Sequence, residues 1–170
     1  ETELRKALAL NHPQDQVIPP LANALLAQGQ AKKITDEFGK TTLTDKTAQG
    51  SFLTTLATAY AAQGQNESAQ STLDAALAAT PDYAPARLIQ ARQKGGQRDF
   101  DGALAITDDV IAKNPRSFEA WKFKGDLLRY AKNQPAEALA AYRKSVEIQP
   151  DFLVGQAAVI TLLLQQNNLT

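Results

Sequence analysis

The stretch "EALAAYRKSVEIQPD", residues 137–151, decides the fold. It carries Ala138, an aromatic residue four positions later at Tyr142, and Pro150 twelve positions after the alanine. Residues four apart lie on one face of a helix, and proline stops a helix because it has no N–H to continue the hydrogen bonding. The stretch is therefore either a single amphipathic helix ending at a proline or one copy of a repeated unit.

Two earlier stretches of the chain carry the same pattern. They are "SAQSTLDAALAATPD" (68–82) and "GALAITDDVIAKNPR" (102–116), whose alanines at 69 and 103 align with Ala138. Their prolines at 81 and 115 align with Pro150, at spacings of 34 and then 35 residues. An amphipathic run precedes two of these helices. In one run, apolar residues lie three, four and seven positions after Leu53, at Leu56, Ala57 and Tyr60; in the other, Gly125 and Leu128 lie four and seven positions after Trp121. Each unit is therefore predicted to be a helix, a tight turn and a second helix.

Small residues in these units indicate how the two helices pack. Antiparallel helices approach closely only where a side chain is small. We therefore expect the small residues of the first helices to face the alanines of the second: Ala57, Ala91 and Gly125 against Ala69, Ala103 and Ala138. The extra residue of the 35-residue unit falls near "YAKNQPAEA". Because Pro135 suits the first turn of a helix, the insertion is expected to lengthen the turn before it.

These residues resemble the tetratricopeptide repeat family. Units 50–83 and 118–152 match its pattern well. Unit 84–117 matches less well, because it has Arg87 and Gln90 where bulky apolar residues are usual and Thr107 in place of an aromatic residue. An earlier copy at about 15–49, a partial repeat at 1–14 and another at 153–170 extend the resemblance over the chain. It implies an all-α fold, a right-handed α-solenoid of antiparallel helix pairs (the TPR superhelix), formed as a single array over 1–170.

A narrower resemblance concerns "ELRKALAL", "VIPPLANALLAQGQAKKITDEF" and "AWKFKGDLLRYAKNQPAEALAAYRKSVEIQPD". These stretches are similar to the PEP-CTERM system TPR-repeat lipoproteins, envelope proteins of Gram-negative bacteria encoded with exopolysaccharide and exosortase functions. The resemblance implies a periplasmic or cell-envelope location, while a cytoplasmic one stays open. Since the sequence has no methionine and begins inside a helical pattern, we expect it to be a piece of a longer protein.

Composition excludes several classes of protein. With 44% hydrophobic and 21% charged residues the chain is globular, and its 18 basic residues equal its 18 acidic ones. Nucleic-acid binders usually carry a basic surplus, so no nucleic-acid partner is expected. The most apolar window, 152–164, contains Gln156 and is too short to span a bilayer, so we expect no membrane insertion by this segment. Without cysteine the chain has no disulfide, thiolate nucleophile or cysteine metal site.

The residues that could support catalysis or bind a metal have simpler explanations. His12 has no nucleophile near it and suits a solvated turn. The glycine pair in "KGGQRDFDG" (94–102) lacks phosphate-loop spacing and is interpreted as turn glycines. An acidic cluster is formed by Asp99, Asp101, Asp108 and Asp109, and a calcium site is conceivable there. Asp99 and Asp101 are better explained as acids that stabilise the first turn of a helix. We therefore predict no catalytic residue, no cofactor, no metal site and no enzymatic activity.

The family resemblance implies a binding face on the first helices, which line the concave side. The positions next to the packing stripe are then the protein-binding candidates: Asn23, Thr54, Thr58, Leu88, Arg92, Lys122, Asp126 and Arg129. Arg92, Lys122 and Arg129 could donate to a partner's carboxylate, or Lys122 and Asp126 could simply pair on a solvated helix. The family's chaperone-tail clamp uses lysine and asparagine in one helix, and Asp126 follows Lys122 instead.

The predicted function is a non-catalytic protein–protein interaction scaffold that binds a protein or peptide on its concave face, with a role in envelope exopolysaccharide or protein-sorting machinery as the narrower form. One alternative is self-assembly into a homo-oligomer, in which the apolar faces of "LRKALALN" and "LVGQAAVITLLL" stack end to end. Another is that the chain is the non-catalytic scaffold segment of a larger enzyme.

Overall fold

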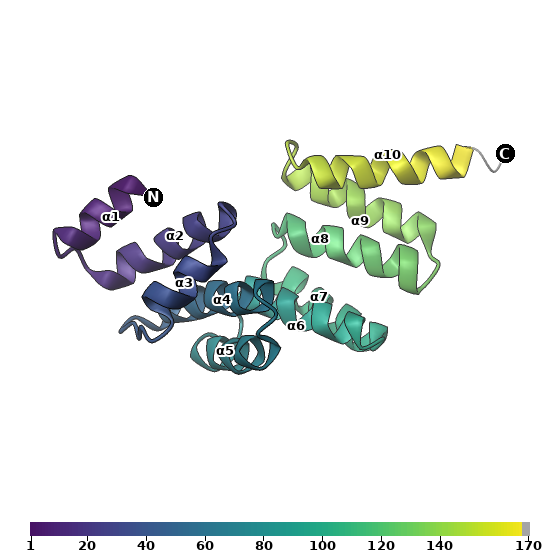
Figure 1. Ribbon diagram of the computed structural model, residues 1–170. Coiled ribbons are helices and arrows are strands. Elements are labelled where there is room, and N and C mark those ends of the chain that lie inside the picture. The colour runs from purple at the N-terminus through teal and green to yellow at the C-terminus, as the bar shows by residue number, and fades with distance from the viewer. Residues whose placement is uncertain (168–170) are drawn as a thin grey trace. The chain divides into compact units, whose positions relative to one another are not determined.

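The computed structural model describes residues 1–167, in which helices alternate with short connections (Figure 1). The first helices are α1 (Thr2–Ala9), α2 (Gln14–Ala27), α3 (Ala31–Phe38), α4 (Lys46–Ala62) and α5 (Asn66–Ala79). They are followed by α6 (Ala84–Gly96), α7 (Phe100–Lys113), α8 (Phe118–Asp126), the π-helical turn η1 (Leu127–Ala131), α9 (Pro135–Ile148) and α10 (Leu153–Asn167). The all-α prediction is confirmed, and the repeat boundaries and the single array stay predictions.

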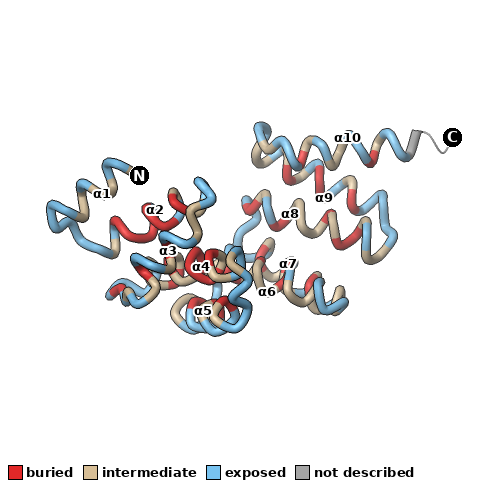
Figure 2. The backbone as a smooth tube through the Cα atoms, viewed as in Figure 1, coloured by how far each residue is buried: buried red, intermediate tan, exposed pale blue. Residues whose placement is uncertain are grey.

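The helices form two compact units, Glu1–Ala86 and Arg87–Thr170, with the division inside α6. In the first unit α4 packs against α2, α3 and α5. In the second, α9 packs against α8, η1 and α10, while α7 packs against α8 and η1. Buried residues lie along the helix faces that meet, and exposed residues lie on the outer faces and in the turns (Figure 2).

The core of the first unit is built from α2, α3 and α4. Its buried apolar residues are Ile18, Leu21, Ala22, Leu25, Ile34, Phe38, Leu43, Phe52, Leu56 and Ala59. On α4 the buried stripe starts at Phe52, whereas the sequence pattern placed it at Leu53, which is only half-buried. The helix also begins at Lys46 instead of residue 50, because the Asp45 carboxylate accepts a hydrogen bond from the Ala48 N–H at 2.8 Å and caps it.

The core of the second unit centres on Tyr142 of α9, which is fully buried. Around it lie Leu128, Ala138, Ala141 and Leu162. A Cβ added to Gly125 of α8 would overlap the ring of Tyr142. Gly125 therefore makes room for Tyr142, and not for Ala138, which the sequence pattern had placed opposite it.

Each helix pair is joined by a turn of the same length and conformation. Residues 28–30, 63–65, 97–99 and 132–134 connect the helices of the four pairs. Their middle residues all have a positive φ: Gly29 (72°), Gly64 (74°), Arg98 (65°) and Asn133 (54°). Left-handed residues of this kind end helices, and glycine and asparagine adopt them most readily.

The prediction that the extra residue lengthens the last of these turns is wrong. The turn keeps three residues, and the extra residue is taken up inside the first helix, where Leu127–Ala131 form a π-turn. There the Lys132 N–H donates to the Leu127 carbonyl, five residues back, at 3.1 Å. A π-turn holds one more residue than an α-turn, so the helix still reaches the same three-residue connection.

The helix ends follow the sequence closely. Helices α5, α7 and α9 end at Ala79, Lys113 and Ile148, each two residues before the predicted proline. Ser117 caps α8 by accepting a hydrogen bond from the Ala120 N–H at 3.4 Å. These local signals persist in the structure because they act within one turn of the helix.

Candidate functional site

Two neighbouring depressions lie on the first helices of the second unit. The charged hollow, about 200 Å³, lies between α6, α8 and the start of α10 and is lined by Arg92, Glu119, Lys122, Phe123, Asp126, Phe152 and Val154. The aromatic pocket, about 320 Å³, lies between the end of α6, the start of α7 and α8–η1. Its lining is Arg92, Gly95, Gly96, Phe100, Phe123, Asp126, Leu127, Tyr130 and Ala131. The two share Arg92, Phe123 and Asp126, so they form one continuous candidate site.

Arg92 lies on the exposed face of α6 at the junction of the two depressions. Its guanidinium carbon is 5.5 Å from the centre of the Phe123 ring, a distance typical of a cation–π contact. Among residues 1–167 no carboxylate lies within ion-pair distance of it. The site therefore presents the Arg92 guanidinium against an aromatic ring, in a hollow that Glu119 and Asp126 also line.

Lys122 and Asp126 behave differently, because they pair with each other. Lys122 Nζ lies 2.7 Å from Asp126 Oδ2, and the other carboxylate oxygen, Oδ1, accepts a hydrogen bond from the Tyr142 hydroxyl at 2.9 Å. Burial of Tyr142, with a further contribution from the nearby Asp126 charge, raises the pKa of this hydroxyl, so it remains a donor at neutral pH. Both oxygens of Asp126 are thus occupied: the pair with Lys122 is the one that the simple pairing interpretation described, and the bond from Tyr142 was not predicted.

Arg129 is held away from the depressions. Its Nη2 donates to Gln165 Oε1 of α10 at 2.7 Å, and its guanidinium carbon lies 4.7 Å from the centre of the Tyr130 ring. Arg129 follows Asp126 through the π-turn, so its direction does not follow the α-helical spacing on which the prediction relied. The structure thus brings together Arg92, Lys122 and Asp126 and leaves Arg129 outside the set.

The remaining predicted residues have no common surface. Thr54 and Leu88 are only 5% and 4% exposed, so as buried side chains they leave the candidate site. Thr54 donates to the Gly50 carbonyl at 2.7 Å, and the half-buried Thr58 donates to the Thr54 carbonyl at 2.9 Å. Asn23 is exposed, and its side-chain oxygen accepts a hydrogen bond from the Thr55 hydroxyl. Because α4 has neighbours on several sides, positions beside its packing stripe are buried too.

Seven residues of the aromatic pocket were not among the predicted binding residues: Gly95, Gly96, Phe100, Leu127, Ala131 and the aromatic pair Phe123 and Tyr130. The aromatic pair lies near Lys122 and Arg129 in the sequence, so an aromatic residue next to a predicted cation was the available signal. The glycine pair was interpreted as turn glycines, which is wrong, because both belong to the last turn of α6 and the left-handed turn residue is Arg98.

The acidic cluster is divided among separate ion pairs. Asp99 caps α7 by accepting from the Gly102 N–H at 3.0 Å, and it pairs with Lys94, whose hydrogen bond lowers the pKa of the Asp99 carboxyl. Its other members pair individually: Asp101 with Lys132, Asp108 with Lys124, and Asp109 with Arg87 and Lys113. Within residues 1–167 no three acidic or histidine side chains are grouped so as to hold a metal ion.

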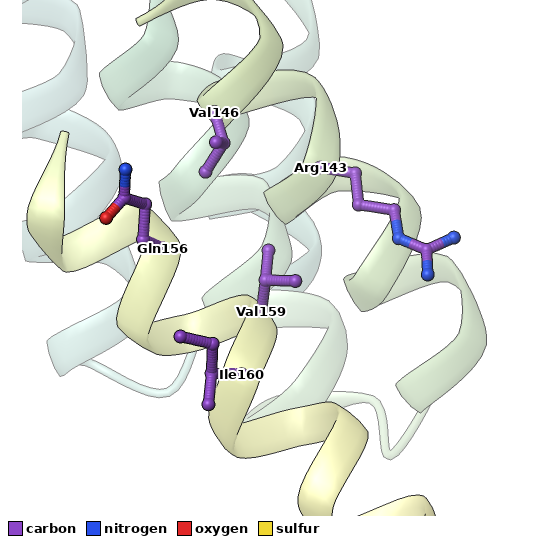
Figure 3. Close-up of a pocket in the computed structure, with 5 residues that line it drawn as sticks. All are labelled: Arg143, Val146, Gln156, Val159 and Ile160. Carbon is purple, nitrogen blue, oxygen red and sulfur yellow. The ribbon is translucent and has the colours of Figure 1, made fainter. Parts of the chain in front are cut away.

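Two further surfaces lie outside the candidate site. His12 is exposed in the turn after α1. A third pocket of about 270 Å³ lies between α9 and α10, where Val146 and Val159 face each other and Arg143 extends away (Figure 3). None of the helices in the described part of the chain has both the length and the apolar character needed to cross a bilayer.

Comparison with known proteins identifies the family. A sequence model of the tetratricopeptide repeat matches residues 54–93 and 90–151, which is more than half of the chain. The chain therefore belongs to the tetratricopeptide repeat family, whose members are generally non-catalytic scaffolds for protein interactions. A comparison with curated protein sequences gave no match.

Solved structures share the fold at low sequence identity. TTC0263, a thermophilic TPR protein of Thermus thermophilus, is 22% identical with a TM-score of 0.70, and the match covers 96% of this chain and 88% of that one. YrrB, described as a TPR protein with an unusual peptide-binding site, is 21% identical (TM-score 0.58; 91% and 79% covered). The first TPR of Spaghetti (RPAP3), bound to the HSP90 peptide SRMEEVD, is 18% identical (TM-score 0.58; 70% and 94% covered).

Proposed function

We propose that this chain is a non-catalytic scaffold that binds a protein or peptide across the charged hollow and the aromatic pocket of its second unit. The observation that carries the proposal is Arg92, a cation without a carboxylate partner among residues 1–167, fixed on the Phe123 ring where the two depressions join. An arginine fork held in place by its stacking contact loses less conformational freedom when it binds a carboxylate. The peptide-bound Spaghetti TPR and the peptide-binding site of YrrB support this class of partner.

The test is a selection of random peptides against the purified chain, followed by affinity measurements with labelled peptides. Reversing the charge at the junction, Arg92→Glu, is expected to weaken binding at least tenfold. Arg116→Glu changes the charge equally at an exposed position that lines neither depression and should leave affinity unchanged. Far-ultraviolet circular dichroism should show equal helicity in all three proteins.

Two outcomes would refute the proposal. If no peptide is enriched over a selection without protein, the chain is not a peptide-binding scaffold of this kind. If peptides are enriched but bind Arg92→Glu as tightly as the wild type, the binding face lies elsewhere on the molecule.

The cellular setting of the proposal rests on the resemblance to the PEP-CTERM system TPR-repeat lipoproteins. On that basis the scaffold acts in the periplasm or envelope, within exopolysaccharide or protein-sorting machinery. Fractionation of the native cells, with detection by an antibody to this chain, tests the location. Recovery with the cytoplasmic fraction alone would reject it.

Self-assembly is a second candidate because of the apolar surface on α10. Ile160 and Leu164 are both more than half exposed, and Ile160 borders the pocket of Figure 3. Exposed apolar surface of this kind favours association with a second copy. Light scattering over a range of concentrations should then show a rising mass that the Ile160→Asn variant abolishes. A constant monomer mass would exclude this candidate.

A further inference from the structure

We infer that the aromatic pocket takes a bulky apolar side chain of the bound peptide while Arg92 takes a carboxylate beside it. The inference rests on the proposed function and adds the chemistry of the partner: an acidic peptide with an aromatic residue or leucine next to its negative charge. Such a peptide would place one uncharged and one charged group in the two parts of a single site.

The pocket is apolar in its depth and aromatic at its sides. Its floor contains Leu127, which is 6% exposed, and a Cβ built on Gly95 would lie 3.8 Å from the Leu127 side chain. The side chains of Phe100, Phe123 and Tyr130 complete the lining, and Tyr130 is 72% exposed. Covering water-accessible apolar surface with an apolar group is favourable, so it stabilises the complex.

The size of the pocket selects a single side chain. Pockets for small molecules and cofactors generally measure about 300–1,000 Å³. At about 320 Å³ the aromatic pocket lies at the lower end, and it continues into the charged hollow. A peptide that lays one large side chain into the pocket and passes along the hollow fits this shape better than an isolated cofactor does.

The charges at the rim select the neighbouring group. Among the residues that line the aromatic pocket, Arg92 and Asp126 are charged, and Asp126 is already bonded to Lys122 and Tyr142. The charge available to a ligand is therefore that of the Arg92 guanidinium. A carboxylate is its natural partner, because it accepts two parallel hydrogen bonds from the guanidinium fork. Two carboxylates would be less favourable, since Glu119 lines the adjoining hollow.

The π-turn supplies one side of this pocket. Leu127, Tyr130 and Ala131 all belong to Leu127–Ala131, the segment that contains the extra residue of the 35-residue unit. Opposite them, Gly96 adds no side chain, and a Cβ built there would have no atom within 4 Å. Isolated π-turns occur frequently at functional sites, because they redirect side chains without breaking the helix. The inserted residue and the glycine pair thus open the same space from two sides.

The experiment uses the selected peptides and a variant that fills the pocket. Gly96→Leu puts an apolar side chain into the open space, and its φ is not in the left-handed region, so leucine is compatible with the helix. We expect at least tenfold weaker binding for Gly96→Leu and for Arg92→Gln. The matched controls, Ala140→Leu on the exposed face of α9 and Arg116→Gln, should bind as the wild type does. Tyr130→Ala, which alters only an exposed side chain, gives a second probe of the pocket should Gly96→Leu fold poorly.

The selected peptides provide the second readout. Replacing the aromatic residue or leucine of a peptide by alanine should weaken its binding to the wild type at least tenfold and change its binding to Gly96→Leu little. Replacing the acidic residue by its amide should likewise weaken binding to the wild type at least tenfold and change binding to Arg92→Gln little. Enriched peptides that share no such pair, or that bind Gly96→Leu and Tyr130→Ala at full affinity, would overturn the inference while leaving the scaffold function standing. Absence of any enriched peptide would remove both.

Discussion

The pair α4–α5 in the first unit and the pair α8–η1–α9 in the second are built on one plan. Each has a three-residue connection with a left-handed middle residue, Gly64 or Asn133. Each buries an alanine of the second helix, Ala69 or Ala138. The pairs differ in size at the position four residues later, which is Leu73 in one and Tyr142 in the other. The Tyr142 ring lies against Gly125, and α4 has Ala57 at the corresponding position. A larger side chain on one helix is thus matched by a smaller one on the other.

The fourth pair is one residue longer than the third, α6–α7, and this difference shows where such a repeat can absorb an insertion. The extra residue enters η1 and not the turn, because the left-handed turn must keep its three residues to bring the second helix back antiparallel. The α4–α5 pair has no π-turn, so it has no counterpart of the segment that carries Tyr130 into the lining of the aromatic pocket.

The largest effect is expected from Gly125→Ala, which gives the fourth pair the small residue of the second. The added Cβ overlaps the buried Tyr142 ring, and overpacking of a core costs about 2 kcal/mol. Urea denaturation should show this loss. Gly95→Ala is the matched control, because its Cβ makes an ordinary 3.8 Å contact with Leu127 and should leave stability equal or slightly raised. Unchanged stability of Gly125→Ala would disprove the size match, and Tyr142→Leu should relieve the defect.

Deletion of Ala131 shortens the fourth pair to the length of the third. We expect the π-turn to become an ordinary α-turn, with helicity retained in circular dichroism. Peptide affinity should fall at least tenfold, or about 1.4 kcal/mol, because the pocket loses the segment that forms its wall. The substitution Ala136→Ser on the exposed start of α9, which keeps the length and lies outside both depressions, should bind normally. Full affinity after the deletion would show that the inserted residue has no part in the site.

Gly64→Ala tests the turn of the second pair. Its φ of 74° lies in the left-handed region, where a residue with a Cβ costs about 1 kcal/mol more than glycine. Thermal and urea unfolding should both report the loss. Gly96→Ala, whose φ is not left-handed, is a suitable control and should not be destabilised. An equal response of the two glycines would contradict the role given to the turn conformation.

The smallest effect is expected from Asn133→Gly in the turn of the fourth pair. Asparagine tolerates φ of 54° better than most residues, so replacing it by glycine should raise stability by only about 0.5 kcal/mol. A differential measurement against the wild type in urea can resolve this gain. Destabilisation would mean that the Asn133 side chain makes a contact that outweighs its strained backbone.

The sequence predicted the helices and their ends better than it predicted the site. Prolines 81, 115 and 150 and the cap at Ser117 act within one helical turn, so their spacing could be interpreted without a fold. The burial of Thr54 and Leu88 could not, because burial depends on tertiary packing and not on the local pattern of residues. Arg129 was placed by α-helical spacing, which fails at a π-turn. Phe123 and Tyr130 were overlooked because neither belongs to the repeat pattern.

By itself the sequence determined that this protein is a series of helix pairs of the tetratricopeptide repeat family, with an extra residue in the fourth unit. Periodicity carries this information because every apolar face must return to the same side to be buried. Only the tertiary structure decided that the extra residue forms a π-turn, that Gly125 accommodates Tyr142, and that Arg92 remains without a carboxylate partner among residues 1–167. These features arise from contacts between helices, where the size and charge of a side chain act across space and not along the chain.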